Sequence, residues 1–145
     1  MNRALGIVNF SRSHVHVEGL QDYRPIGAFS FLGRYRVIDF PLSNMSNSGI
    51  EYIQIYANKQ PRSLVEHVGT GRHYNINSKR GDLHMLFSET NIANPIYDTD
   101  IAAYVNNMQY IERSHQMYVI IAPSYMVYTM DYSELLQTHV ESEAD

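Results

Sequence analysis

Apolar residues gather in four short runs that predict β-strands. The runs lie at 4–10, 51–57, 84–87 and 117–122, and β-branched or aromatic residues are frequent in them. The first and last runs carry no charge, which is typical of parallel strands covered on both faces. Pro123 ends the last run. The pattern therefore predicts a buried parallel sheet with 117–122 as a central strand.

Helical spacing of apolar residues separates these runs and predicts three helices. The longest spans 101–111, with Asp98 or Thr99 as its N-cap. A short helix begins at 61–63, and the last helix begins at Asp131, with Glu134 completing a capping-box pattern. The apolar stripes are Ile101, Tyr104, Val105, Met108 and Ile111; Leu64, Val65 and Val68; and Tyr132, Leu135, Leu136, His139 and Val140. Alternation of strands and helices predicts an α/β fold. The polar stretch 72–95, apart from the strand candidate 84–87, predicts a long loop of a kind that is usually functional or mobile.

The stretch 33–45 (Gly-Arg-Tyr-Arg-Val-Ile-Asp-Phe-Pro-Leu-Ser-Asn-Met) combines a basic turn, a short apolar segment and the start of a further helix. Asp39 is predicted to cap this helix with its carboxylate. Pro41 suits the first turn, where the missing N–H costs nothing. The Asn-Ser-Gly sequence at 47–49 is a typical helix end.

Composition narrows the possible classes of protein. The chain has 145 residues, 44% of them hydrophobic, which is enough for one domain with a core and excludes a disordered polar segment. A net charge of −4 argues against a nucleic-acid or anionic-membrane binder. Cysteine is absent, so neither disulfides nor thiolate metal sites are expected. No apolar run is long enough to span a bilayer, and the N-terminus lacks a signal-peptide pattern, so we expect a cytoplasmic protein.

Residues 33–44 closely resemble the signature F-G-G-(K/R)-(Y/F)-R-(L/I)-I-D-F-P-L-S-N of bacterial glucose-1-phosphate adenylyltransferases, which make ADP-glucose for glycogen. Further similarities lie at 23–25 (Tyr-Arg-Pro), 47–50 (Asn-Ser-Gly-Ile), 62–67 (Arg-Ser-Leu-Val-Glu-His) and 130–136 (Met-Asp-Tyr-Ser-Glu-Leu-Leu). The resemblance implies a Rossmann-like nucleotidyltransferase sheet with flanking helices. It also implies that 1–145 is the N-terminal part of a nucleotidyltransferase-like domain, without the C-terminal β-helix of the family.

The first departure from the family lies in the loop after the first strand. Family members have G-G-x-G-(T/S)-R-L there, because glycines let the backbone approach a triphosphate closely. Here no glycine occurs between Gly6 and Gly19. His16 falls near the position of the family's catalytic arginine, and a neutral histidine replaces a fixed guanidinium poorly.

The second departure lies at the end of the strand over 117–122. The family has A-G-D-(H/Q), whose aspartate holds the catalytic metal, whereas this chain has Ala-Pro-Ser-Tyr at 122–125. No carboxylate occurs between Glu112 and Asp131. Smaller departures are Ile26, where the family often has lysine, and Asp-Thr-Asp-Ile at 98–101, where it has G-T-A-D. Metal charge neutralisation is central to nucleotidyl transfer, so these losses predict weak or absent catalysis.

The combination of an intact signature and a degenerate site resembles the non-catalytic accessory subunit of Gram-positive glycogen operons, the GlgD type. The prediction is a regulatory subunit without catalytic residues, in which His16, Pro123 and Ser124 are the degenerate positions. The family uses magnesium and ATP, but this chain is expected to hold no cofactor or metal of its own. Its expected partner is a catalytic subunit, within a heterotetramer, and neither nucleic acid nor membrane is an expected partner.

Two alternatives remain open from the sequence. One is an active adenylyltransferase with a substitute nucleotide loop and a carboxylate from beyond residue 145. The other is a binding module that senses a sugar phosphate or a nucleotide. Basic side chains are candidates for binding such an effector, because arginine binds phosphate with two donors, although a solvated basic surface explains them equally. These candidates are Arg24, Arg34, Arg36, Lys59 and Arg62.

Overall fold

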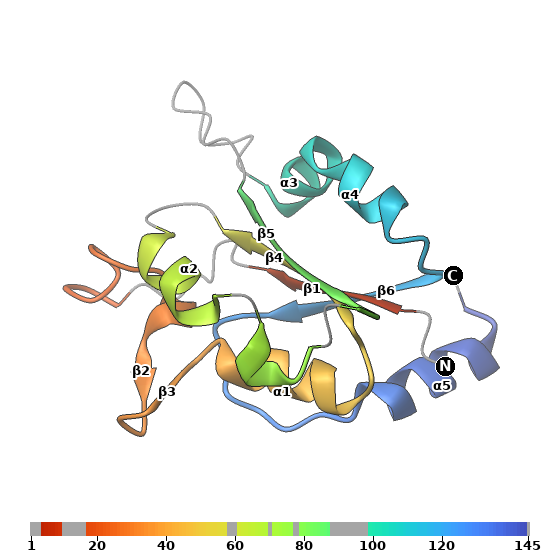
Figure 1. The fold of residues 1–145 in the computed structure, drawn as a ribbon, viewed down its shortest axis with the longest axis horizontal. Coiled ribbons are helices and arrows are strands. Elements are labelled where there is room, and N and C mark those ends of the chain that lie inside the picture. Colours follow the sequence, from red (N-terminus) through yellow and green to blue (C-terminus); the bar gives the residue numbers. More distant parts are fainter. Residues whose placement is uncertain are drawn as a thin grey trace.

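The fold is a parallel sheet covered by helices on both faces (Figure 1). The computed structural model describes residues 4–9, 17–57, 61–69, 71–76, 79–87 and 99–144. Within them the strand order of this sheet is β5–β4–β1–β6, and each of its pairings is parallel. The strands are β1 (Ala4–Asn9), β4 (Tyr52–Ala57), β5 (Asp82–Phe87) and β6 (Tyr118–Pro123). The predicted α/β class and the four predicted strands are therefore confirmed.

The position of β6 differs from the prediction. The run 117–122 was expected in the centre of the sheet, but among the described residues β6 lies at an edge, and β4 and β1 are the two inner strands. Ile120 and Ala122 are buried on one face, whereas Val119 and Ile121 are about half exposed on the other. The absence of charge in β6 thus does not mean that both of its faces are covered.

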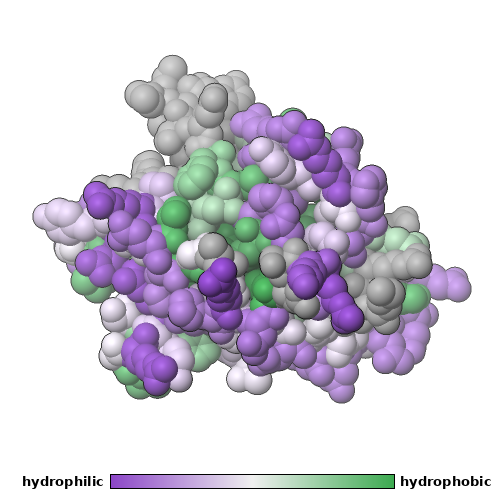
Figure 2. Space-filling view, in the orientation of Figure 1, coloured by the Kyte–Doolittle hydropathy of each residue, from purple (hydrophilic) through white to green (hydrophobic). Residues whose placement is uncertain are grey.

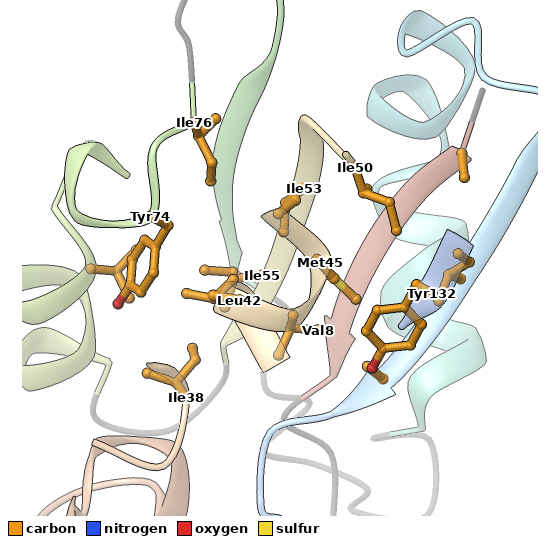
Figure 3. Close-up of a cluster of buried hydrophobic side chains, with 14 of the residues drawn as sticks. Val8, Ile38, Leu42, Met45, Ile50, Ile53, Ile55, Tyr74, Ile76 and Tyr132 are labelled. Atoms are coloured by element: carbon orange, nitrogen blue, oxygen red, sulfur yellow. The ribbon is translucent and has the colours of Figure 1, made fainter. Parts of the chain in front are cut away.

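The larger core lies on the face covered by α1 (Asp39–Asn47) and α5 (Tyr132–Ser142) (Figure 3). Leu42 and Met45 of α1 are fully buried there against the sheet. Pro41 lies in the first turn of α1, and Gly49 follows its end with a φ of 76°, as the sequence predicted. The strand side chains in this core are Ala4, Val8, Ile53, Ile55, Ala57, Ile120 and Ala122.

The opposite face is covered by α3 (Asp100–Asn106) and α4 (Met108–Arg113), so the single predicted helix over 101–111 is wrong. The break is at Asn107, whose side-chain amide donates to the carbonyl of Ala103, since asparagine competes for backbone groups inside helices. Tyr104 and Ile111 pack on the sheet, but Ile101 is 72% exposed. Only part of the predicted apolar stripe is therefore buried.

The remaining elements cluster around the amino end of α1. They are η1 (Ile26–Ala28), β2 (Ser30–Phe31), β3 (Tyr35–Arg36), α2 (Arg62–Val68) and η2 (Arg72–Tyr74). Helix α2 buries Leu64 and Val68 but leaves Val65 partly exposed, so its stripe is narrower than predicted. Leu135 and Val140 of α5 are likewise about half exposed. No helix in the described ranges is long and apolar enough to cross a membrane.

Two predicted helix caps are confirmed. The hydroxyl of Thr99 accepts the N–H of Ala102 at the start of α3, while Asp98 lies outside the described residues. The carboxylate of Asp131 accepts the N–H of Ser133 at the start of α5, at 2.8 Å. Hydrogen bonds from the hydroxyl and the backbone N–H of Ser133 lower the pKa of Asp131. Asp131 is thus already engaged as a helix cap.

Alkaline pH is expected to destabilise the fold through its buried tyrosines. Burial raises the pKa of Tyr56 and of Tyr104 from about 10 to about 12, and their rings meet edge to face at 5.1 Å. A pKa that is higher in the folded state favours folding below pH 10, and this contribution is lost as the pH rises toward 12. Unfolding free energies from urea titrations should therefore fall between pH 10 and 12. Tyrosinate absorbance of the native protein should lag that of the urea-unfolded protein over this range; coincident curves would contradict the expectation.

Candidate functional site

The carboxyl ends of the parallel strands define the first candidate site, because ligands of open α/β sheets bind at that edge. The strands end at Asn9, Ala57, Phe87 and Pro123. The loop that follows β1 carries the predicted degenerate position His16, and the segment after β4 carries the effector candidate Lys59. Both residues lie outside the described residues, so their predicted roles stay predictions.

The end of β6 is fastened to the end of β1. Pro123 lies opposite Asn9 in the parallel register, and the N–H of Ser124 donates to the carbonyl of Asn9 at 3.2 Å. Ser124, which the resemblance aligns with the family's metal-holding aspartate, is only 2% exposed. This strand end therefore presents a buried, backbone-anchored serine where the resemblance implies a carboxylate.

A carboxylate nevertheless reaches this edge from α3. The side-chain amide of Asn9 donates a short hydrogen bond to Oδ2 of Asp100, while Oδ1 of Asp100 is buried and has no hydrogen-bond partner among the described residues. The pKa of Tyr104 is raised first by burial of its ring and second by the nearby negative charge of Asp100. Sequence reasoning did not foresee this contact. Its only signal is that Asp100 stands one residue before the position at which the family pattern G-T-A-D has its aspartate.

These residues do not fit the magnesium site implied by the family. The strand end offers serine and proline, and Asp100 is a single carboxylate with one oxygen committed to Asn9. Across the described ranges, no three histidine, aspartate or glutamate side chains lie close enough together to hold a metal. Magnesium is held by carboxylate and phosphate oxygens, so the described part of this edge offers too few protein ligands for us to derive a metal-dependent step.

The second candidate site is built by the signature, and its centre is Asp39. The N-cap of α1 is Ile38, without a side-chain capping bond, so the prediction that Asp39 caps this helix is wrong. Its Oδ2 accepts the N–H of Arg36 at 2.7 Å, and its Oδ1 accepts the hydroxyl of Tyr74 at 2.6 Å. Nε2 of His67 lies 2.7 Å from the same Oδ1. Donors from α2 and η2, distant in sequence, thus direct the carboxylate away from the capping position.

Arg36 is also engaged within the fold. Its Nη1 donates to the carbonyls of Ser63 at 3.1 Å and Ala28 at 3.4 Å, which joins β3 to α2 and η1. Arg62 is 92% exposed and pairs with Glu66 one helical turn later. The structure therefore holds Arg36 with backbone groups instead of leaving it open toward an anion.

Arg24 and Arg34 are exposed and make no ion pair within the described part of the chain. Among the effector candidates that the structure describes, Arg36 alone contacts the helix that carries another candidate. It donates to the carbonyl of Ser63, the residue after Arg62 in α2. The described candidates do not converge on one pocket. An effector role for them stays a prediction.

A hairpin of the two short strands projects from this region (Figure 1). Phe31 lies opposite Tyr35, and both rings pack edge-on against Phe40 of α1. The ring centroids are 5.3 Å apart for Phe31 and Phe40, and 6.3 Å apart for Tyr35 and Phe40. At the tip Leu32 has a φ of 52° and is 80% exposed. Sequence reasoning missed Leu32, although the signature F-G-G shows glycine at that position, which is the residue that a positive φ favours.

Comparison with a family profile and with individual proteins identifies the family of this chain. A parallel sheet covered by helices on both faces defines the chain as a Rossmann-like α/β protein. The sequence profile of the nucleotidyl transferase family matches residues 21–145, and the chain belongs to that family. The similarity that the signature implied is thereby confirmed at the level of the family.

Similarity to individual proteins narrows the family further. Glycogen biosynthesis protein GlgD of Geobacillus stearothermophilus is 36% identical over 99% of this chain, and that of Bacillus subtilis (strain 168) is 31% identical over 99%. Glucose-1-phosphate adenylyltransferase of Clostridium perfringens (strain SM101 / Type A) is 36% identical over 81%. This chain spans only 42% of the two GlgD proteins and 31% of the adenylyltransferase.

Proposed function

We propose that this chain belongs to a non-catalytic regulatory subunit of glucose-1-phosphate adenylyltransferase, the enzyme that converts ATP and glucose 1-phosphate to ADP-glucose and pyrophosphate. It would act in the cytoplasm in glycogen synthesis, assembled with a catalytic subunit in a heterotetramer. Regulation would work by differential contacts with two states of that partner. The similarity to two GlgD proteins over 99% of the chain supports the pathway.

The observation that carries the non-catalytic assignment is the end of β6. Ser124 replaces the metal-holding aspartate, is buried, and is fixed to Asn9 through its backbone N–H. A serine hydroxyl carries no negative charge and cannot replace a carboxylate as a magnesium anchor. Electrostatic stabilisation of the developing phosphate charge is a dominant part of such catalysis, so its loss favours regulation over chemistry.

Asp100 favours a second candidate, an active adenylyltransferase with a relocated carboxylate. Its Oδ1 is buried at the same edge and has no hydrogen-bond partner in the described part of the chain, which is costly unless another group satisfies it. Under this alternative Asp100 would be essential for turnover. A single variant, Asp100→Asn, therefore separates the two candidates.

The test is pyrophosphate release from ATP and glucose 1-phosphate in the presence of magnesium. The full-length chain, the catalytic subunit and their mixture are assayed at equal subunit concentrations. We expect no release by the chain alone, and a change of about 5-fold or more in rate or effector affinity in the mixture, the usual size of allosteric coupling.

The control for this assay is Asp100→Asn, which keeps the size of the side chain. In the regulatory case the variant mixture behaves like the wild-type mixture. Magnesium-dependent release by the purified chain alone, abolished in Asp100→Asn, would establish the active alternative instead. A mixture that matches the catalytic subunit alone under all effector conditions would refute regulation.

A further inference from the structure

The tip of the β2–β3 hairpin has two unusual properties, both of which belong to Leu32. Leu32 adopts a left-handed backbone conformation that is unfavourable for a residue with a Cβ atom. It is also the most exposed of the large apolar side chains described, at 80%. Neither property benefits the isolated chain, because glycine at this position would remove both the strain and the exposed apolar surface.

The hairpin is held rigidly, which matters for binding. The rings of Phe31 and Tyr35 pack against Phe40 at the base of the hairpin. Beyond β2 and β3, the N–H of Val37 donates to the carbonyl of Phe29, which extends the backbone pairing. Arg36 and Asp39 then fasten β3 to α2 and α1. A side chain on such a support loses little conformational freedom when it is buried, so most of its apolar contact contributes to affinity.

Charge indicates the kind of surface that covers the tip. Arg34 lies in the same turn, is exposed, and makes no ion pair with any described residue. The chain as a whole is acidic, with a net charge of −4, so this basic tip is a local exception. Figure 2 shows apolar surface beside hydrophilic surface at the lower left, where Figure 1 places the hairpin. The complementary surface is an apolar pocket with acidic side chains at its rim.

We propose that Leu32 anchors this chain to the catalytic subunit by inserting into such a pocket, with Arg34 facing its acidic rim. The inference rests on the proposed function and names the contact through which it acts. The adenylyltransferase signature has glycine where this chain has Leu32, so a catalytic subunit cannot make the same contact with itself. The anchor therefore favours the mixed assembly over assemblies of catalytic subunits alone.

The test measures the affinity of the full-length chain for the catalytic subunit by biolayer interferometry. Leu32→Gly removes the side chain and the strain, whereas Leu32→Ser removes the apolar contact but keeps the strain. Both should weaken binding by about 10- to 30-fold, as for a central anchor. Leu32→Gly should also raise the melting temperature by a few degrees (about 3 °C). Arg34→Glu should slow association and reverse its salt dependence.

The matched control is Leu135→Ser, an exposed leucine on α5, which lies away from the hairpin (Figure 1). Its affinity should stay within about 2-fold of the wild type, as for a surface residue outside the contact. Wild-type binding that both Leu32 variants retain would overturn the anchor and leave the proposed function standing. Failure of the wild-type chain to bind the catalytic subunit would overturn both.

Discussion

Replacing Asp39 with alanine should lower the free energy of unfolding by about 3–5 kcal/mol. The carboxylate is only 13% exposed and receives the N–H of Arg36 and the hydroxyl of Tyr74, with Nε2 of His67 beside them. Alanine leaves at least two buried donors without a partner, and each such donor costs about 1–3 kcal/mol. Urea unfolding followed by circular dichroism measures the loss.

The partners of Asp39 supply the controls. Tyr74→Phe removes one hydroxyl donor and should cost about 1 kcal/mol, because no buried group is left charged and alone. In a double-mutant cycle, Asp39→Ala and Tyr74→Phe should together cost less than the sum of the two by about 1 kcal/mol. Additive losses would show that the carboxylate and the hydroxyl act independently, contrary to the 2.6 Å contact.

Replacing Gly81 with alanine should be the second large effect, about 2–4 kcal/mol. A Cβ atom at Gly81 would lie 2.3 Å from the carbonyl oxygen and 2.5 Å from the Cβ of Glu51. The next residue, Asp82, donates its N–H to that same carbonyl at 2.9 Å, which starts the pairing of β4 with β5. Backbone atoms cannot move aside as a flexible side chain can, so the two strands must separate at their amino ends. Thermal and urea unfolding would both report the loss.

Gly19→Ala is the matched control for Gly81→Ala. Gly19 has a φ of 78°, and no described atom lies within 4 Å of the position of a Cβ atom there. Alanine there meets only the conformational cost of the left-handed region, about 1 kcal/mol. Equal effects at the two glycines would show that the close approach of Glu51 can be relieved at little cost.

Local sequence patterns predicted the strands and most helix ends, because these depend on neighbouring residues. Thr99 and Asp131 cap helices as predicted, and Gly49 ends α1. Predictions failed where the deciding partner is remote. Asp39 has the spacing of a helix cap, but Tyr74 and His67 take its carboxylate. The position of β6 in the sheet likewise depends on strand order, which no single run of residues encodes.

At the candidate sites, too, the sequence predicted features that depend on neighbouring residues and missed those that depend on remote ones. The loss of the acidic residue at the end of β6 was visible in the sequence as Pro123 and Ser124. The approach of Asp100 to Asn9 was not, since it depends on where α3 begins above the sheet. The sequence predicted one helix over 101–111 where the structure has two, because a regular apolar stripe suggested one continuous buried face. Asn107 interrupts it, and Ile101 faces solvent.

The central place of β1 also constrains how the chain is made. Leu5 pairs with Tyr52, so one edge of β1 is completed early during synthesis, but Ala4 pairs with Tyr118 at the other edge. On the ribosome that second edge stays open until β6 has emerged, and an open strand edge is a template for wrong partners. Pairings so distant in sequence fold slowly. The edge of β1 that pairs with β6 is therefore the part of this sheet that stays exposed longest during synthesis.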